Sequence, residues 1–355
     1  MHFCGGDQKF MAINVIVMMG GPSTEHEVSL ASGRMVYEAL VANPHYQVSA
    51  LVIDRQGHWT IEANPRRIQP QPSQPEAASI SRQESVNGLQ LIANTQVVFL
   101  AFHGAFGEDG TLQGLLETLG IPYTGSGPLA SALAMNKSKA KELFRYHEIP
   151  VTPDVLLTRR LMASDIEGAI NQVEERLAYP LVVKPNTGGS SVGVTMATNA
   201  DHLREALMTA QASGLDVLVE EKLAGREVTC AVLEEFDGSL TALPVIEIVP
   251  RAASFFDFTS KYADGGSDEI CPADLDPKDV DAIQRYAIKA HQVLGCEGFS
   301  RTDMFLTEKG PVVLEVNTIP GMTPNSLLPK AARAAGLSFE ALMDHMVQLA
   351  WRRRS

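Results

Sequence analysis

A polar strand pair close to residue 310 places the tightest limit on the fold of this chain. Residues 300–306 and 311–317 each have the pattern of a strand, and residues 308–310 are expected to form a three-residue turn with Gly310 in the left-handed conformation. In that register Thr307 faces Pro311, and two polar pairs face each other, Asp303 with Glu315 and Arg301 with Asn317. Because side chains two apart share a face, the opposite face carries Met304, Leu306, Leu314 and Val316.

The two facing carboxylates predict a metal site. Their Cβ atoms would be only about 4.5–5.5 Å apart, so the carboxylates repel each other unless a cation lies between them. A set of oxygen ligands without Cys or His suits Mg²⁺ or Mn²⁺, and Mg²⁺ completes its octahedron with phosphate oxygens and water. We therefore expect Asp303, Glu315 and Asn317 to be metal ligands. The alternative is a solvated polar face balanced by Arg301.

A glycine- and serine-rich segment over residues 184–193 joins two expected strands. Small residues let backbone N–H groups approach phosphate oxygens, and Lys184 at the entrance supplies positive charge. The segment lacks the G-x-x-x-x-G-K-[ST] pattern of a P-loop and leads into a strand rather than a helix. Together with Lys137 and the acidic pair, it is interpreted as a flap over the phosphates of a nucleotide. An ordinary turn is the alternative.

The first part of the chain has the pattern of a parallel sheet. Apolar segments at residues 14–19, 48–53 and 97–102 are continuous, as strands covered on both faces tend to be. The glycine turn at residues 20–23 follows the first of them, and Thr24 with Glu27 has the spacing of a capping box that opens a helix. We therefore assign the chain to the α/β (α+β) class.

The rest of the chain alternates helices and strands. We expect strands near residues 181–184, 192–196 and 217–221 and a helix over residues 200–212. A hairpin turning at Asp237-Gly238, a helix after Pro277 and two terminal helices complete the pattern.

Composition narrows the class of protein. The 355 residues suffice for two or three domains, and 29 basic residues against 42 acidic ones give a net charge of −13. We therefore expect neither nucleic acid nor an anionic membrane as a partner. Cys4, Cys230, Cys271 and Cys296 are too widely spaced for a disulfide framework or a zinc site. No apolar segment approaches the roughly 18 residues of a membrane span, so a cytoplasmic protein is expected.

Residues 125–130 match the loose dinucleotide fingerprint G-x-G-x-x-[GA]. Pro128 within the turn weighs against it, as does the absence of a clear second strand ending in an acidic residue about twenty positions later. An NAD-linked oxidoreductase remains an alternative.

Six motifs follow one another along the chain: residues 20–29, residues 103–104 with 107–110, and residues 184–193, 301–303, 315–317 and 320–327. Together they resemble the D-alanine–D-alanine ligase family of the ATP-grasp superfamily, and the resemblance runs from about residue 13 to the C-terminus. It implies a three-domain ATP-grasp architecture: an N-terminal α/β substrate domain at 12–125, a central ATP-grasp subdomain at 126–223, and a C-terminal ATP-grasp subdomain carrying the metal and substrate site at 224–355.

The resemblance also implies the chemistry. The family uses ATP to phosphorylate the carboxylate of one D-alanine, and the amine of a second D-alanine then attacks the acylphosphate, giving the dipeptide used in peptidoglycan precursors. Two Mg²⁺ (or Mn²⁺) ions would be held by Asp303, Glu315 and Asn317. The family is usually homodimeric, so a homodimer is expected here.

Site residues follow from the resemblance by position. The ATP-binding residues would be Lys137, Lys184, Glu220, Glu221, Leu223, Glu227 and Lys261. The catalytic residues would be Glu25, Ser190, Tyr262, Arg301 and Gly321, and the substrate-binding residues would be His103, Ser326 and Leu327.

The implied roles of these residues differ. Glu25 would hold the ammonium of the first D-alanine, and His103 would lie by its carboxylate. Arg301 and the Gly321 N–H would stabilise the oxyanion of the intermediate. Ser326 and the backbone of Leu327 would bind the carboxylate of the second alanine at a helix start.

A polar loop that contains Lys261 and Tyr262 matches the mobile lid of the family. There the tyrosine would hydrogen-bond toward Ser190 and Glu25, and relatives that make serine-ended or ester-ended products differ in this loop. The resemblance therefore favours D-alanine as the second substrate. Two alternatives stay open: a carboxylate–amine ligase for another amino acid, and a nucleotide-binding regulator without turnover.

Overall fold

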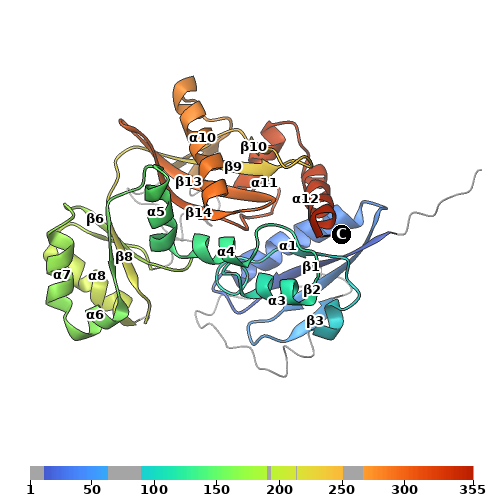
Figure 1. Cartoon of the computed structure of the whole chain (residues 1–355), viewed down its shortest axis with the longest axis horizontal. Helices are drawn as coiled ribbons and strands as arrows, with labels where there is room; N and C mark the ends of the chain where they lie inside the picture. Colours follow the sequence, from blue (N-terminus) through green and yellow to red (C-terminus); the bar gives the residue numbers. More distant parts are fainter. Residues whose placement is uncertain (1–11, 63–88, 190–192, 213, 251–266, 355) are drawn as a thin grey trace, which may run out of the picture.

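A computed structural model describes residues 12–62, 89–189, 193–212, 214–250 and 267–354 (Figure 1). The described residues form three sheets, each covered by helices. None of the helices in these ranges combines the length and apolar character needed to cross a bilayer.

The first sheet has the order β3-β2-β1-β4, and β1 is parallel to both of its neighbours. Its strands are β1 (Ile13–Gly20), β2 (Tyr46–Ile53), β3 (Trp59–Glu62) and β4 (Val97–Leu100). The helices packed with it are α1 (His26–Val41) and α3 (Thr111–Leu119). The predicted parallel sheet is thus confirmed, although its third strand ends at Leu100 rather than at residue 102.

The predicted capping box at the start of α1 is wrong. The Ser23 hydroxyl accepts the Glu25 N–H at 3.0 Å, and the helix begins at His26 with Glu25 as its N-cap and no side-chain capping bond. Glu27 instead pairs with Arg55 at 3.4 Å. Arg55, which follows β2, therefore binds the Glu27 carboxylate that the capping box predicted at the start of the helix.

A second sheet, entirely antiparallel, has the order β5-β8-β6-β7. Its strands are β5 (Asp154–Leu157), β6 (Leu181–Pro185), β7 (Thr195–Ala197) and β8 (Val217–Glu221), and helices α6 (Arg159–Ser164), α7 (Ile166–Glu174) and α8 (Ala200–Ala212) cover it. These elements share one apolar core and form a separate lobe at the left of Figure 1.

The third sheet is also antiparallel, with the order β12-β11-β9-β13-β14 and β10 beside β9. Its strands are β9 (Arg226–Glu234), β10 (Leu240–Ala242), β11 (Ile246–Pro250), β12 (Ser267–Ile270), β13 (Phe299–Thr307) and β14 (Gly310–Asn317). Three helices, α4 (Pro128–Met135), α5 (Lys137–Tyr146) and α10 (Pro277–Leu294), contribute to the same core.

The predicted polar pairs of this sheet are confirmed: Asp303 lies opposite Glu315, and Arg301 lies opposite Asn317. The turn is wrong by one residue, because Thr307 pairs with Gly310, which has a φ of 110°. A register shift between Asp303 and Met304 lets the predicted polar pairs form together with the shorter turn.

Because of the same shift, the side chain of Leu314 does not lie on the apolar face that strand alternation predicted for it. Val313, fully buried, packs in the core of the sheet, whereas Leu314 lines the cavity on the polar side. The extra residue in β14 turns Leu314 across the sheet.

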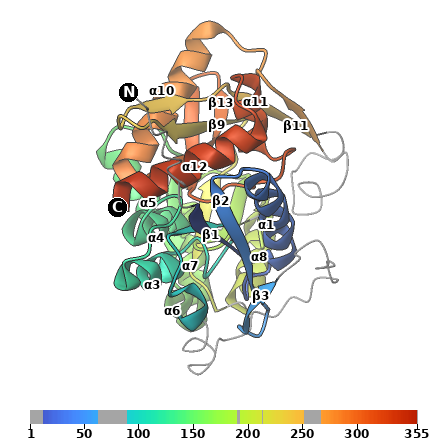
Figure 2. The same cartoon turned by 90° about the vertical axis from the view of Figure 1, so that its right-hand side faces the viewer.

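Helices α11 (Leu327–Ala334) and α12 (Phe339–Arg354) confirm the two predicted terminal helices. Figure 2 shows α12 running between the third sheet and the first. A single apolar core joins side chains of β1, the third sheet and α12, among them Val17, Leu233, Phe299, Leu342 and Met346. This continuous core fixes the first sheet against the third.

Candidate active site

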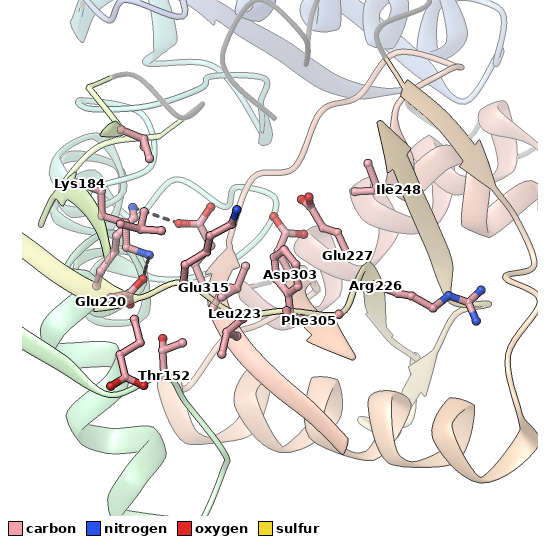
Figure 3. Close-up of a pocket in the computed structure, with 18 of the residues that line it drawn as sticks. Thr152, Lys184, Glu220, Leu223, Arg226, Glu227, Ile248, Asp303, Phe305 and Glu315 are labelled. Atoms are coloured by element: carbon pink, nitrogen blue, oxygen red, sulfur yellow. Dashed lines mark ion pairs between the residues drawn. The ribbon is translucent and has the colours of Figure 1, made fainter. Parts of the chain in front are cut away.

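A cavity among the described residues has a volume of about 840 Å³. Its walls come from strands β6 and β8 of the second sheet and from strands β9, β11, β13 and β14 of the third sheet. Figure 3 shows Asp303 and Glu315 side by side in its centre, with Lys184 and Glu220 on one side and Glu227 and Ile248 on the other. The polar face predicted for β13 and β14 therefore opens into a cavity between two sheets.

Each of the two facing carboxylates has a cationic partner. Asp303 accepts two hydrogen bonds from the Arg301 guanidinium, at 2.9 and 2.8 Å, and one from the Thr229 hydroxyl at 2.6 Å. Glu315 Oε2 lies 3.1 Å from Lys137 Nζ. These cations offset the repulsion between the carboxylates that the sequence pattern implied.

Asn317 completes the predicted ligand set. Its amide nitrogen donates to Asp303 Oδ2 at 3.0 Å, so the three side chains form one cluster. The described residues hold no group of three or more His, Cys, Asp or Glu side chains arranged for a metal. Two carboxylates and an amide oxygen nevertheless fit Mg²⁺, because this ion is usually held by one or two carboxylates together with substrate phosphates.

The amino end of α5 positions Lys137. Asn186, just after β6, accepts the Lys137 N–H at its backbone oxygen (3.0 Å) and the Ser138 N–H at its side chain (2.9 Å). Lys137 Nζ donates to the Gly188 carbonyl at 2.7 Å. The predicted flap and the first residue of α5 are therefore held together at the cavity wall.

Lys184 and Glu220 form a buried ion pair with N–O separation 2.6 Å. Lys141, fully buried, contacts the other oxygen of Glu220 and donates to the Thr152 hydroxyl at 2.8 Å. Burial opposes the ionisation of Glu220, but Lys184 and Lys141 outweigh it and hold the pKa of that carboxyl below its usual range. Burial also lowers the pKa of Lys141, to about 8. Glu220 is therefore an ionised acceptor at the cavity wall.

Three further predicted ATP-binding residues line the same cavity: Glu221, Leu223 and Glu227. Glu221 also accepts the Ala178 N–H at 3.1 Å. They follow one another from the end of β8 to the start of β9, so the backbone between these strands forms an edge of the cavity.

A second group of predicted residues lies beside the cavity, at the carboxyl end of β1. Glu25 is buried, and its carboxylate lies so close to Gly104 and Gly189 that a Cβ at either position would come within 2.7 or 2.9 Å of Oε2. Since Gly189 lines the cavity, Glu25 lies where the first sheet meets the flap. Glycine at both positions permits this close approach.

His103 is buried, and its Nε2 lies 2.9 Å from the Ser32 hydroxyl. Burial lowers the pKa of His103 to about 4, so the ring is neutral near pH 7. Glu108 accepts the N–H groups of Gly104 at 2.7 Å and Ile319 at 3.2 Å. Burial raises the pKa of Glu108 to about 8. The nearby Glu25 carboxylate adds to this rise, and Arg301 opposes it.

Ser326 is the N-cap of α11, and Leu327 is the first residue of that helix. The Ser326 hydroxyl accepts the Thr323 N–H at 3.1 Å and lies 2.8 Å from the Thr323 hydroxyl. A Cβ on Gly321 would come within 2.8 Å of Ser326 Oγ. The structure thus brings Gly321 and Ser326 together at a helix amino end, where partial positive charge favours anions.

Three predicted residues, Ser190, Lys261 and Tyr262, lie outside the described residues. Two residues of the site, Lys141 and Glu108, were not predicted from the sequence. Lys141 follows Lys137 by four residues and therefore shares its helix face, and that spacing could have revealed it. Glu108 belongs to the motif at residues 107–110, but nothing in that motif indicates its contact with Ile319.

Comparison with known proteins gives two family matches. A model described as D-ala D-ala ligase N-terminus matches residues 14–126, and one described as D-ala D-ala ligase C-terminus matches residues 143–348. A similar protein is the D-alanine–D-alanine ligase of Leptospira interrogans, 39% identical over 352 residues, with 96% of this chain and 98% of the relative covered.

Two solved structures are similar over nearly the whole chain. The VanG D-Ala:D-Ser ligase from Enterococcus faecalis has a TM-score of 0.79 at 34% identity, covering 96% of this chain and 100% of that one. The D-alanine–D-alanine ligase from Bacillus anthracis, complexed with ATP, has a TM-score of 0.74 at 32% identity, covering 97% and 98%.

Proposed function

Since the chain belongs to the D-alanine–D-alanine ligase family, we propose that it joins two D-alanine molecules to D-alanyl-D-alanine, using ATP, for peptidoglycan precursor synthesis. The sequence-based identification of the family and of the α/β class is confirmed, and the fold is that of ATP-grasp ligases. The observation that carries the proposed function is the cavity in which Lys137 and Lys184 lie beside the carboxylates of Asp303 and Glu315.

The cavity suits phosphoryl transfer. We propose that ATP lies there with its phosphates between the lysines and the acidic pair, because lysines act as point charges on phosphate oxygens. Glu221, Leu223 and Glu227 would bind the adenosine along the edge between β8 and β9. Bound by Asp303, Glu315 and Asn317, two Mg²⁺ ions would neutralise charge on the phosphates during transfer.

The residues beside the cavity suit acyl chemistry. Glu25 would bind the ammonium of the first D-alanine, and the neutral His103 would lie near its carboxylate. Arg301, which Asp303 holds in one orientation, and the Gly321 N–H would stabilise the oxyanion that forms when the second amine attacks. Ser326 and the Leu327 N–H would bind the carboxylate of the second alanine.

Ser190, Lys261 and Tyr262 keep the roles that the family resemblance gives them, in the flap and the lid. The division at 12–125, 126–223 and 224–355 is likewise a proposal. One sheet falls in each range, which supports it, whereas α4 and α5, which lie within 126–223, pack in the core of the third sheet. A cytoplasmic homodimer is part of the same proposal: the compartment rests on the sequence pattern, and the dimer rests on the resemblance alone.

The test is phosphate release by the purified protein. We expect release only when D-alanine, ATP and Mg²⁺ are all present, and little or none with L-alanine. Glu315→Gln removes a proposed metal ligand, so release should fall by a factor of about 100 or more. Glu308→Gln, an exposed carboxylate in the adjacent turn, is the matched control and should leave the rate unchanged. Equal rates with L-alanine would overturn the substrate assignment.

A D-Ala:D-Ser ligase is the second candidate, favoured by the likeness to the Enterococcus faecalis enzyme. By the family resemblance, relatives that make serine-ended products differ in the loop that contains Tyr262, which favours D-alanine here. A competition assay with equal D-alanine and D-serine, read by mass spectrometry of the dipeptides, decides between them. We expect D-alanyl-D-alanine to dominate.

A further inference from the structure

Residues 319–322 follow β14 and contain Gly321, the proposed oxyanion donor. Ile319 donates its N–H to Glu108 Oε1 at 3.2 Å, and Met322 donates its N–H to Ser32 Oγ at 3.3 Å. Pro320 has no N–H to donate. The Gly321 N–H has no hydrogen-bond partner among the residues that the structure describes. The backbone on both sides of Gly321 is therefore anchored, and the one remaining donor is available to a ligand.

Both anchors come from the N-terminal part of the chain. Ser32 lies in α1 and is fully buried. Its hydroxyl oxygen accepts the Met322 N–H and lies 2.9 Å from His103 Nε2. His103 in turn follows β4 by three residues, so Ser32 also contacts the segment after that strand. Ser32 thus connects helix α1 to the residue that follows Gly321.

Glu108 links the same loop to the proposed ammonium site. One oxygen of its carboxylate accepts the Ile319 N–H, and the other accepts the Gly104 N–H at 2.7 Å. The Glu25 carboxylate lies directly against Gly104. The distance between Glu25, which would bind the ammonium, and Gly321, which would bind the oxyanion, is therefore set through Glu108 and Ser32.

We propose that Ser32 and Glu108 are positioning residues that hold residues 319–322 so that the Gly321 N–H points at the reacting carboxylate of the first amino acid. This inference rests on the proposed ligase function. Neither side chain needs to touch the substrate. A preorganised donor stabilises a transition state only if it is held in place before the charge develops, and a misplacement of about 1 Å can cost a factor of about 100.

The chain offers a matched control for Ser32. Ser29 lies one turn earlier in α1, is also fully buried, and makes two hydrogen bonds of its own, accepting the Gly20 N–H at 2.7 Å and donating to the Ala101 carbonyl at 2.6 Å. Ser29→Ala should therefore destabilise the fold about as much as Ser32→Ala. It makes no hydrogen bond to residues 319–322, so it should keep kcat within about threefold.

The experiment measures kcat, the KM for ATP and the melting temperature of wild type, Ser32→Ala, Ser29→Ala, Glu108→Gln and Glu108→Ala. We expect kcat to fall by a factor of about 10–100 in Ser32→Ala and Glu108→Ala, with the KM for ATP within about twofold of wild type. Glu108→Gln retains one acceptor oxygen and should recover part of the loss. Amide exchange at Gly321 and Met322 should be faster in Ser32→Ala and unchanged in Ser29→Ala.

The outcomes distinguish failure of the positioning role from failure of the ligase function. If wild type releases phosphate with D-alanine but Ser32→Ala and Ser29→Ala lose kcat equally, the positioning role is wrong and the ligase function stands. Unchanged exchange at Met322 in Ser32→Ala overturns the positioning role even if that variant loses activity through poor folding. If wild type shows no release that depends on D-alanine, the ligase function fails and the positioning role fails with it.

Discussion

Acid should unfold this protein partly through His291, a histidine of α10 that is 1% exposed. Its Nδ1 lies 2.8 Å from the Ser300 hydroxyl, and its Nε2 has no hydrogen-bond partner in the described part of the chain. Burial lowers the pKa of His291 from 6.5 to about 4. The folded protein therefore keeps this ring neutral over a pH range in which the unfolded chain protonates it.

The sign and size of the effect follow from linkage. Between pH 6.5 and pH 4 the unfolded state binds the additional proton, so the contribution to stability is complete above pH 6.5 and is lost as the pH falls. Between pH 7 and pH 5 the free energy of unfolding should fall by about 2 kcal/mol because of His291 alone. His103, whose pKa burial also lowers to about 4, adds a loss of the same sign.

Urea unfolding of wild type and His291→Asn at pH 7 and pH 5 isolates the His291 contribution. Asparagine can still hydrogen-bond Ser300 and does not titrate, so its loss between the two pH values should be about 2 kcal/mol smaller than that of wild type. His147→Gln, an exposed position, is the control and should behave as wild type. If wild type and His291→Asn lose equal free energy between pH 7 and pH 5, burial does not keep His291 neutral and the reasoning is refuted.

Two further predictions concern the first sheet. Gly20 has a φ of 93°, and a Cβ there would lie 2.2 Å from the Ile53 carbonyl oxygen, so Gly20→Ala should destabilise by about 3 kcal/mol in equilibrium unfolding. Gly114→Ala, where a Cβ on helix α3 meets nothing within 4 Å, should instead raise stability slightly, and equal effects would contradict this account. Tyr46 donates to Asp344 at 2.5 Å, and Tyr46→Phe should cost about 2 kcal/mol in the same assay; no measurable change would show that this contact between β2 and α12 adds nothing.

The sequence predicted those parts of the site that depend on local periodicity. Asp303 and Glu315 could be paired because side chains alternate along a strand and a short turn fixes the register. The register shift after Asp303 could not be predicted, because Val313 and Leu314 are both apolar and either one suits the core. The capping box failed for a related reason: the pattern of Thr24 and Glu27 was present, but a distant residue, Arg55, took the carboxylate.

Contacts between segments distant in sequence could not be predicted from the spacing of residues. The Met322 N–H and the Ser32 hydroxyl are 290 positions apart in sequence, and no local pattern in α1 distinguishes Ser32 from Ser29. Lys141 is an intermediate case, because its helix face could be predicted from Lys137 but its partner, Glu220, lies on a strand 79 positions away. Local rules thus identified the chemical groups, and the tertiary fold decided which groups meet.

The position of α12 affects how the chain can fold during synthesis. Side chains of β1 and β4, such as Val17 and Phe99, share one apolar core with residues of α12, such as Leu342 and Met346. A ribosome-bound chain that has not yet produced α12 therefore lacks part of the apolar cover of its first sheet, although α1 and α3 are already present. The strands made first therefore gain their full apolar cover only when one of the last helices packs against them, and the apolar surface exposed until then should favour aggregation of incompletely folded chains.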